Sequence, residues 1–194
     1  HRPDAARIEA VVARVSAWDR LRRTPVGSRD LALVLSTYPG KGWQMAHAVG
    51  LDALASTEAV LEDLAGAGYG IAPGAPLESL QHSFESWPLD AYRAALASLP
   101  PELQADLHDT WGAPEADPGC RENAFHFAAL RRGRALVALQ PERGEALNRD
   151  GDYHDLTRTP RHGYVAFYLW LRAQAPQALG LLVVLALLRG VGEG

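Results

Sequence analysis

The chain has 194 residues, which is enough for one good hydrophobic core with a small appendage. Its 19 basic and 23 acidic residues leave a net charge of -4, which argues against a nucleic-acid or membrane-surface partner. A single cysteine, Cys120, excludes an internal disulfide and a multi-cysteine metal site, so we expect a reducing compartment such as the cytoplasm.

The first 28 residues predict a helix and a linker. Apolar residues recur at helical spacing between Asp4 and Arg23, with Asp4 as a plausible N-cap. These apolar residues are Ile8, Val11, Val15, Trp18 and Leu21. Because the chain starts at His1 without a methionine and is amphipathic from the outset, we expect it to be an excised piece of a larger protein.

Residues 29–194 predict an α/β domain. Leu31 to Tyr38 form a buried strand, a glycine-containing loop follows, and Ser56 or Thr57 can cap the next helix. Tyr69 to Ile71 predict a short second strand, which would complete a β-α-β unit with a parallel pair. The expected fold is therefore Rossmann-like, with a mostly parallel sheet and flanking helices.

Residues 73–118 have a different character and predict a helical insertion. Short apolar segments separated by prolines predict helices over 77–84, 89–99 and 101–111. Strands are expected at 124–130 and 134–139, joined by a turn, and a helix is expected from Pro160 to Arg172. The apolar run 178–188 is about half the roughly 20 residues needed to span a bilayer, so a buried strand is expected there.

Candidate ligand-binding residues follow the first strand. His47 and Asp52 lie near its carboxyl end, where ligands of open α/β sheets collect, although Asp52 is equally suited to capping the next helix. Pro39-Gly40-Lys41-Gly42 lacks the full spacing of a phosphate-binding loop, so a simple connection between strand and helix is favoured over a nucleotide site.

A second group of candidates comprises Tyr153, His154, Asp155 and His162. His162 falls in the first turn of a helix, where the dipole favours a neutral imidazole that can bind a metal or accept a proton. Pro160 prevents one continuous helix from carrying both histidines, so only the fold can bring them together. Spacing alone favours the alternative that they are ordinary surface or loop histidines.

Two further residues are not expected to act chemically. His126 alternates with Phe125 and Phe127, so it is expected on the opposite face of its strand. Cys120 has no evident activating base, which makes a catalytic thiol improbable.

Three separated segments resemble the large subunit of the cobaltochelatase (CobN) and magnesium-chelatase family. The first is residues 32–56, with Tyr38-Pro39, Ala48-Val49-Gly50-Leu51-Asp52 and Ala55-Ser56. The second is Val137-Ala138-Leu139-Gln140-Pro141 followed by Arg143-Gly144. The third and most specific is Tyr153-His154-Asp155 followed by residues 160–171, Pro-Arg-His-Gly-Tyr-Val-Ala-Phe-Tyr-Leu-Trp-Leu.

The resemblance implies ATP-dependent insertion of Co²⁺ into hydrogenobyrinic acid a,c-diamide in cobalamin biosynthesis, with Mg²⁺ insertion into a porphyrin as the sister reaction. Such an enzyme is a ligase that forms nitrogen-metal bonds. In the family the large subunit binds the tetrapyrrole and the metal, whereas separate motor-type ATPase subunits bind ATP. The third segment resembles the cobalt-inserting members more than the magnesium-inserting ones. The chemistry of the residues alone is compatible with either metal.

On this resemblance, His154, Asp155 and His162 would act as proton acceptors, and His154 and His162 as transient metal ligands. His47, Asp52 and Tyr153 would line the substrate pocket. The tail after Gly180 departs from the family, which continues into a His-Gly-rich segment, so we expect the isolated piece to be inactive. There are two alternatives. The chain could be a non-catalytic α/β module that binds a small anionic ligand, or it could be a scaffold segment.

Overall fold

A computed structural model describes residues 4–35, 52–144, 158–174 and 181–184. The helices are α1 (Ala5–Arg23), α2 (Ala53–Gly66), α3 (Leu89–Leu96), α4 (Pro101–Trp111) and α6 (His162–Gln174). Short 3-10 helices are η1 (Val26–Ser28), η2 (Leu77–His82) and η3 (Pro114–Ala116). The strands are β1 (Leu31–Leu35), β2 (Phe84–Pro88), β3 (Cys120–Arg121), β4 (Ala124–Arg132), β5 (Ala135–Leu139) and β6 (Leu181–Val184).

The strands form one mixed sheet in the order β2-β4-β5-β1-β6, with β3 paired to β4. β1 is parallel to β5 and to β6, whereas β4 is antiparallel to β2, β3 and β5. The α/β class predicted from the sequence is confirmed. The expectation of a mostly parallel sheet is wrong. Strand β4 is antiparallel to β5, its hairpin partner, and it also pairs antiparallel with β2 and β3.

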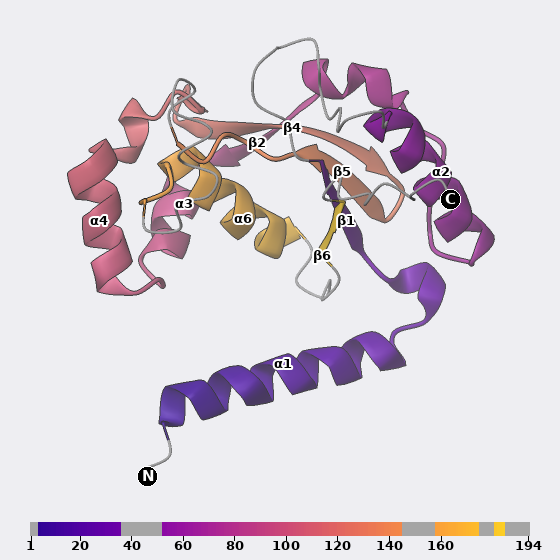
Figure 1. Ribbon diagram of the computed structural model, residues 1–194, viewed down its shortest axis with the longest axis horizontal. Helices are drawn as coiled ribbons and strands as arrows, with labels where there is room; N and C mark the ends of the chain where they lie inside the picture. The colour runs from indigo at the N-terminus through magenta and orange to yellow at the C-terminus, as the bar shows by residue number, and fades with distance from the viewer. Residues whose placement is uncertain (1–3, 36–51, 145–157, 175–180, 185–194) are drawn as a thin grey trace, which may run out of the picture.

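Helices cover both faces of this sheet, which gives three layers (Figure 1). α3 and α6 lie on one face, while α2 and η2 lie on the other. Successive side chains of β1, which lies between β5 and β6, alternate between the two cores. Ala32 and Val34 join the cluster beneath α6, whereas Leu33 and Leu35 join the cluster beneath α2. A continuous apolar run is what a strand covered on both faces requires.

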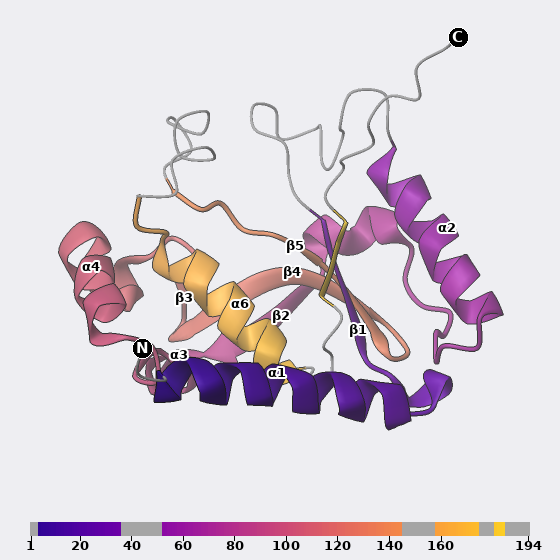
Figure 2. The same cartoon turned by 60° about the horizontal axis from the view of Figure 1, so that its bottom comes forward.

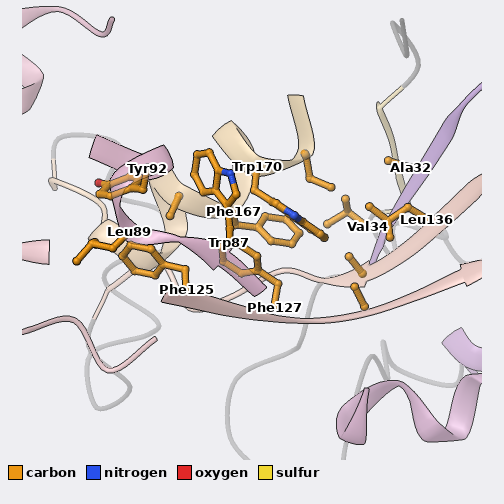
Figure 3. Packing of buried hydrophobic residues seen from close by; sticks show 14 residues of the cluster. Ala32, Val34, Trp87, Leu89, Tyr92, Phe125, Phe127, Leu136, Phe167 and Trp170 are labelled. Carbon is orange, nitrogen blue, oxygen red and sulfur yellow. The ribbon is translucent and has the colours of Figure 1, made fainter. Parts of the chain in front are cut away.

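Six of the fourteen buried residues in the core beneath α3 and α6 are aromatic (Figure 3). The rings of Tyr92 and Phe125 lie 4.9 Å apart, and those of Phe127 and Trp170 are also 4.9 Å apart. Phe167 packs edge-on against Phe127, with the ring centroids 5.5 Å apart. These contacts fix α3 and α6 on the β4 half of the sheet, since tilted and edge-to-face pairs add to the energy of burial.

The hairpin between β4 and β5 depends on Gly133. Its φ of 63° lies in the left-handed region, where a side chain is strained. A Cβ atom there would also lie 2.4 Å from the carbonyl oxygen of Gly70. Gly70 lies in the loop after α2, and its carbonyl also accepts a hydrogen bond from the backbone N–H of Arg134 in the hairpin. The loop after α2 therefore packs closely against the turn.

Helix α1 forms as predicted, and the Asp4 side chain accepts a hydrogen bond from the Arg7 backbone N–H. Its apolar residues nevertheless stay exposed. Trp18 is 58% exposed, and Ile8 is 51% exposed, while Ala17 on the other side of the helix is buried. Val11, Val12 and Val15 are exposed as well. The described part of the chain therefore leaves the apolar face of α1 uncovered.

Other predicted elements are confirmed or corrected one by one. The predicted helix over 101–111 matches α4, and the strand pair 124–130 and 134–139 matches the β4–β5 hairpin. Tyr69 to Ile71 is not a strand, so no β-α-β unit closes there. The helix expected over 77–84 is the shorter η2, followed by the edge strand β2. The block 73–118 thus contributes to the sheet as well as covering it.

Within the described residues, no helix has the length and apolar character required to cross a bilayer.

Candidate functional site

The carboxyl ends of three parallel strands define one edge of the sheet. β5, β1 and β6 are adjacent and point the same way, so they end side by side. Figure 2 shows the ends of β1 and β6 at the upper edge, where α2 also begins. Open α/β sheets bind ligands outside such an edge, because loops and helix N-termini converge there. We name it the carboxyl edge.

Asp52 lies at the carboxyl edge and caps α2. Its Oδ1 accepts hydrogen bonds from the backbone N–H groups of Leu54 at 3.1 Å and Ala55 at 3.0 Å. The alternative role of Asp52 as a helix cap is therefore confirmed, and the expected caps Ser56 and Thr57 are instead inside the first turns. A contact between Asp52 and a substrate stays a prediction. His47 lies outside the described residues.

Gln140 follows β5 directly and connects the carboxyl edge to α6. Its backbone N–H donates to the carbonyl of Leu35 at 2.9 Å, which extends the ladder between β5 and β1. Its side-chain Nε2 donates to the hydroxyl oxygens of Tyr164 at 3.0 Å and Tyr168 at 2.6 Å. The two tyrosines are one turn apart on α6, so a single amide holds both of them.

His162 is buried at the start of α6, with an exposed fraction of 2%. Its Nε2 donates to the Gly112 carbonyl at 3.1 Å, since a carbonyl oxygen can only accept. Nδ1 is then the acceptor, and the Tyr92 hydroxyl donates to it at 2.6 Å. Both ring nitrogens therefore already form hydrogen bonds within the fold, and the imidazole is neutral.

Burial sets the protonation of this pair. It lowers the pKa of His162 below its ordinary value of 6.5, and this effect outweighs the opposing influence of the hydrogen bond to Gly112 and the charge of Asp117. Burial, reinforced by Asp117, raises the pKa of Tyr92 well above its ordinary value. Tyr92 therefore stays protonated as the donor, and His162 stays neutral as the acceptor.

This geometry does not support His162 as a metal ligand. A ligating nitrogen needs a lone pair directed at the metal, but the Nδ1 lone pair already accepts from Tyr92. His154, Asp155 and Tyr153 lie outside the described residues, so the predicted pairing of His154 with His162 stays untested. Within the described residues, no three His, Cys, Asp or Glu side chains form a group that can hold a metal ion.

Asp117 joins the loop after α4 to the start of α6. Its Oδ1 accepts from the Gly119 N–H at 2.8 Å, and its Oδ2 accepts from the Gly163 N–H at 3.0 Å. A carboxylate at this helix N-terminus satisfies a free backbone donor and interacts favourably with the positive end of the helix dipole. A Cβ on Gly163 would lie 3.0 Å from Asp117 Oδ1, so glycine permits this close approach.

The chain on either side of residues 145–157 is held together. The Arg161 N–H donates to the Arg143 carbonyl at 2.8 Å, and the Arg143 guanidinium donates to the Arg158 carbonyl at 3.0 Å. On α4, the Trp111 indole N–H donates to the Thr159 carbonyl at 3.0 Å. The two flanks of the segment that carries His154 are thereby fixed next to α4 and α6.

Cys120 sits near Asp117 and remains a thiol. Burial is the larger cause and the Asp117 charge the smaller cause of its raised pKa, while Arg93 opposes them. A raised pKa disfavours the thiolate, which is the reactive form of cysteine. This agrees with the prediction that Cys120 is not a nucleophile.

Several residues of this site were not identified from the sequence. Tyr92 and Asp117 lie 70 and 46 positions before their partners, and no local pattern signals such contacts. The sequence singles out Gln140 and Tyr164 only as parts of the matching segments. The position of Gln140, directly after a strand that ends at the carboxyl edge, is the one signal that could have identified it.

Fold and site together define an α/β domain with a polar edge at the carboxyl ends of β1 and β5, next to the start of α6. Comparison with known proteins identifies its family. The model of the CobN/magnesium chelatase family matches residues 1–179, and the chain belongs to this family.

Relatives of known description agree with this assignment. The chain is 34% identical over 187 residues to the aerobic cobaltochelatase subunit CobN of Pseudomonas aeruginosa and 30% identical over 190 residues to that of a Sinorhizobium species, covering 87% and 90% of this chain. It is 25% identical over 182 residues to a magnesium-chelatase subunit of Chlorobaculum parvum, covering 85% of this chain and 14% of the relative. The chain spans only 15% of the length of each CobN relative.

A solved structure shows the same fold. The catalytic subunit of cobaltochelatase from Mycobacterium tuberculosis superposes with a TM-score of 0.72 at 28% identity. The match covers 93% of this chain and 16% of that subunit. The resemblance inferred from the three sequence segments is confirmed.

Proposed function

We propose that this chain forms part of the large, tetrapyrrole-binding subunit of an ATP-dependent cobaltochelatase. The reaction inserts Co²⁺ into hydrogenobyrinic acid a,c-diamide, and it forms nitrogen-metal bonds in cobalamin biosynthesis. The observation that carries the proposal is the family match over residues 1–179, because it spans both the carboxyl edge and α6. The cytoplasm is the proposed location.

Metal insertion has two chemical requirements. Two pyrrolic protons must leave the macrocycle as one Co²⁺ enters, and the ion must lose its water ligands. Imidazole and carboxylate groups suit both tasks, since imidazole binds cobalt and either group accepts a proton. We assign these roles to His154 and Asp155, with His47, Asp52 and Tyr153 lining the substrate pocket.

His162 enters the proposal as a positioning residue, in place of the catalytic and metal-binding roles expected from the sequence. It ties α6 to Tyr92 and to the end of α4. These contacts hold the start of α6 in place, and α6 follows the segment that carries His154. It has no free nitrogen for the substrate, and its contribution comes through the placement of neighbouring residues.

ATP is assigned to motor-type ATPase partner subunits. Mg²⁺ would be the metal in the sister reaction. No observation favours the rival of a small-anion binding module or a scaffold over this proposal.

A segment replacement tests the proposal. The 187 residues of the Pseudomonas aeruginosa CobN subunit that match this chain would be replaced by the chain itself, and cobalt insertion would be followed with the partner subunits and ATP. We expect the chimera to insert cobalt. A chimera that folds and binds its partners but inserts none would overturn the proposal.

Substitutions in that chimera test the individual roles. His154→Ala is expected to lower the insertion rate by about 10²-fold, the usual minimum for losing a general base. His126→Ala is the matched control, because His126 lies on β4 with its ring nitrogen near the Arg121 carbonyl and has no assigned role. An unchanged rate for His154→Ala would remove His154 from the mechanism.

A further inference from the structure

The cluster formed by Gln140, Tyr164 and Tyr168 lies at the carboxyl edge, where the side chain of Gln140 holds the two tyrosines of α6. All three are half-buried, so their polar ends are neither sealed in the core nor fully solvated. The rings of Tyr164 and Tyr168 pack at 5.1 Å, and Tyr168 also contacts Phe167 in the core. The cluster is therefore rigid, as a binding group must be.

The internal hydrogen bonds of the cluster determine which polar atoms it can present to a ligand. The side-chain nitrogen of Gln140 has two protons, and it donates one to each tyrosine oxygen. This fixes the amide plane and leaves its oxygen, Oε1, as the acceptor at the other end. The Tyr164 hydroxyl accepts from Gln140 and has no other hydrogen-bond partner among the described residues, so its own proton remains to be donated.

We propose that Gln140 and Tyr164 bind a primary carboxamide group at the edge of the tetrapyrrole. Oε1 of Gln140 accepts from the ligand's amide N–H, and the Tyr164 hydroxyl donates to the ligand's amide oxygen. One acceptor and one donor match the two ends of a carboxamide. This inference rests on the proposed function, and it adds the residues that recognise the substrate's peripheral groups.

The same pair discriminates against a carboxylate at that position. A carboxylate has only acceptor oxygens, so it can bond to Tyr164 but places a negative oxygen against Oε1 of Gln140. None of the three side chains of the cluster is charged, so none offers a compensating cation. Sites built to hydrogen-bond a particular group reject analogues that leave their polar atoms unpaired.

Two probes that differ only in these groups test the inference. Hydrogenobyrinic acid a,c-diamide carries two carboxamides where hydrogenobyrinic acid carries carboxylates. Each would be titrated into the full 194-residue chain and followed by visible absorption. We expect the chain to bind the diamide at least about tenfold more tightly than the acid, the effect of one well-placed hydrogen bond lost and one acceptor left unpaired.

Variants assign the preference to these residues. Tyr164→Phe removes the donor and is expected to weaken diamide binding about five- to tenfold. Gln140→Met is nearly isosteric, but it lacks both the oxygen that accepts from the ligand's amide N–H and the nitrogen that holds Tyr164, and it is expected to abolish the preference for the diamide. Tyr69→Phe is the matched control, since Tyr69 precedes the Gly70 contact at the opposite edge of the sheet.

The outcomes separate the inference from the function on which it rests. Equal affinity for the two probes, or a preference that survives in both site variants, overturns the inference and leaves the proposed function in place. Absence of tetrapyrrole binding by the unaltered chain overturns the inference and counts against the proposed function. Using two site variants keeps the test valid if one of them fails to fold, which thermal unfolding would reveal.

Discussion

The Tyr92 hydroxyl lies 2.6 Å from Nδ1 of His162, although the two residues are 70 positions apart. Both are buried in the layer that holds α3 and α6 against the sheet. Because Nε2 of His162 also donates to Gly112, one imidazole connects α3, the end of α4 and the start of α6.

Tyr92→Phe should destabilise the fold with little change in shape. The substitution leaves the buried Nδ1 of His162 without a donor, which costs about 1–3 kcal/mol of the free energy of unfolding. Urea unfolding of the variant and of the Tyr69→Phe control measures the difference. Equal stability of the two variants would mean that the Tyr92–His162 bond contributes nothing.

Stability should fall in acid because of His162. Its pKa is lower in the folded chain than its ordinary value of 6.5, so the unfolded state binds the proton more readily. The stabilisation is complete above the unfolded pKa and is lost as the pH falls below it towards the folded pKa. Asp117 and His108 also act on the His162 ring, in opposite directions.

The measurement is the free energy of unfolding at about pH 7.5 and about pH 5, for the unaltered chain and for His162→Gln. The variant should be less stable at the higher pH and should lose less stability on acidification. Parallel losses in the two proteins would show that other groups cause the acid sensitivity.

Asp117→Asn should weaken the start of α6. The amide keeps one acceptor oxygen, but its nitrogen then faces one of the two backbone N–H groups that the carboxylate now serves. We expect a loss of about 1.5–3 kcal/mol in the free energy of unfolding, the scale of one hydrogen bond to a charged group. Asp106→Asn, at an exposed position on α4, provides the matched control. A similar loss in both variants would contradict the assigned contacts.

Truncation of α1 side chains should be nearly neutral, because the apolar face of this helix is uncovered. Ile8→Ala removes a side chain from a residue that is 51% exposed and should change the stability by no more than about 0.5 kcal/mol. Leu33→Ala, at a fully buried position of β1, should cost about 2–5 kcal/mol. A large effect of Ile8→Ala would show that α1 packs against this chain in solution.

Local signals were sufficient for much of the fold. α4 was predictable because Pro101 suits the first helical turn and Gly112, with a φ of 74°, ends the helix. The β4–β5 hairpin was predictable from alternating apolar residues around a glycine turn. β2 was missed because an edge strand with mostly exposed residues, ending at Pro88, lacks the apolar pattern of a central strand.

The site was predictable in position more than in detail. The carboxyl edge follows from β1, the glycine-containing loop and Asp52, all of which are consecutive in the sequence. The partners of His162 did not follow, because Tyr92, Gly112 and Asp117 reach it only through tertiary packing. A histidine at a helix start therefore has the same local pattern whether it binds a metal or fills a core.

Hydrogen-deuterium exchange of the full chain, with and without hydrogenobyrinic acid a,c-diamide, tests most directly whether the tetrapyrrole lies over the carboxyl edge. We predict increased protection of the backbone in residues 36–55 and 140–165, and no change near Gly70 and Gly133 at the opposite edge, where the Gly70 carbonyl meets the hairpin. Protection confined to that opposite edge, or to α1, would contradict the account.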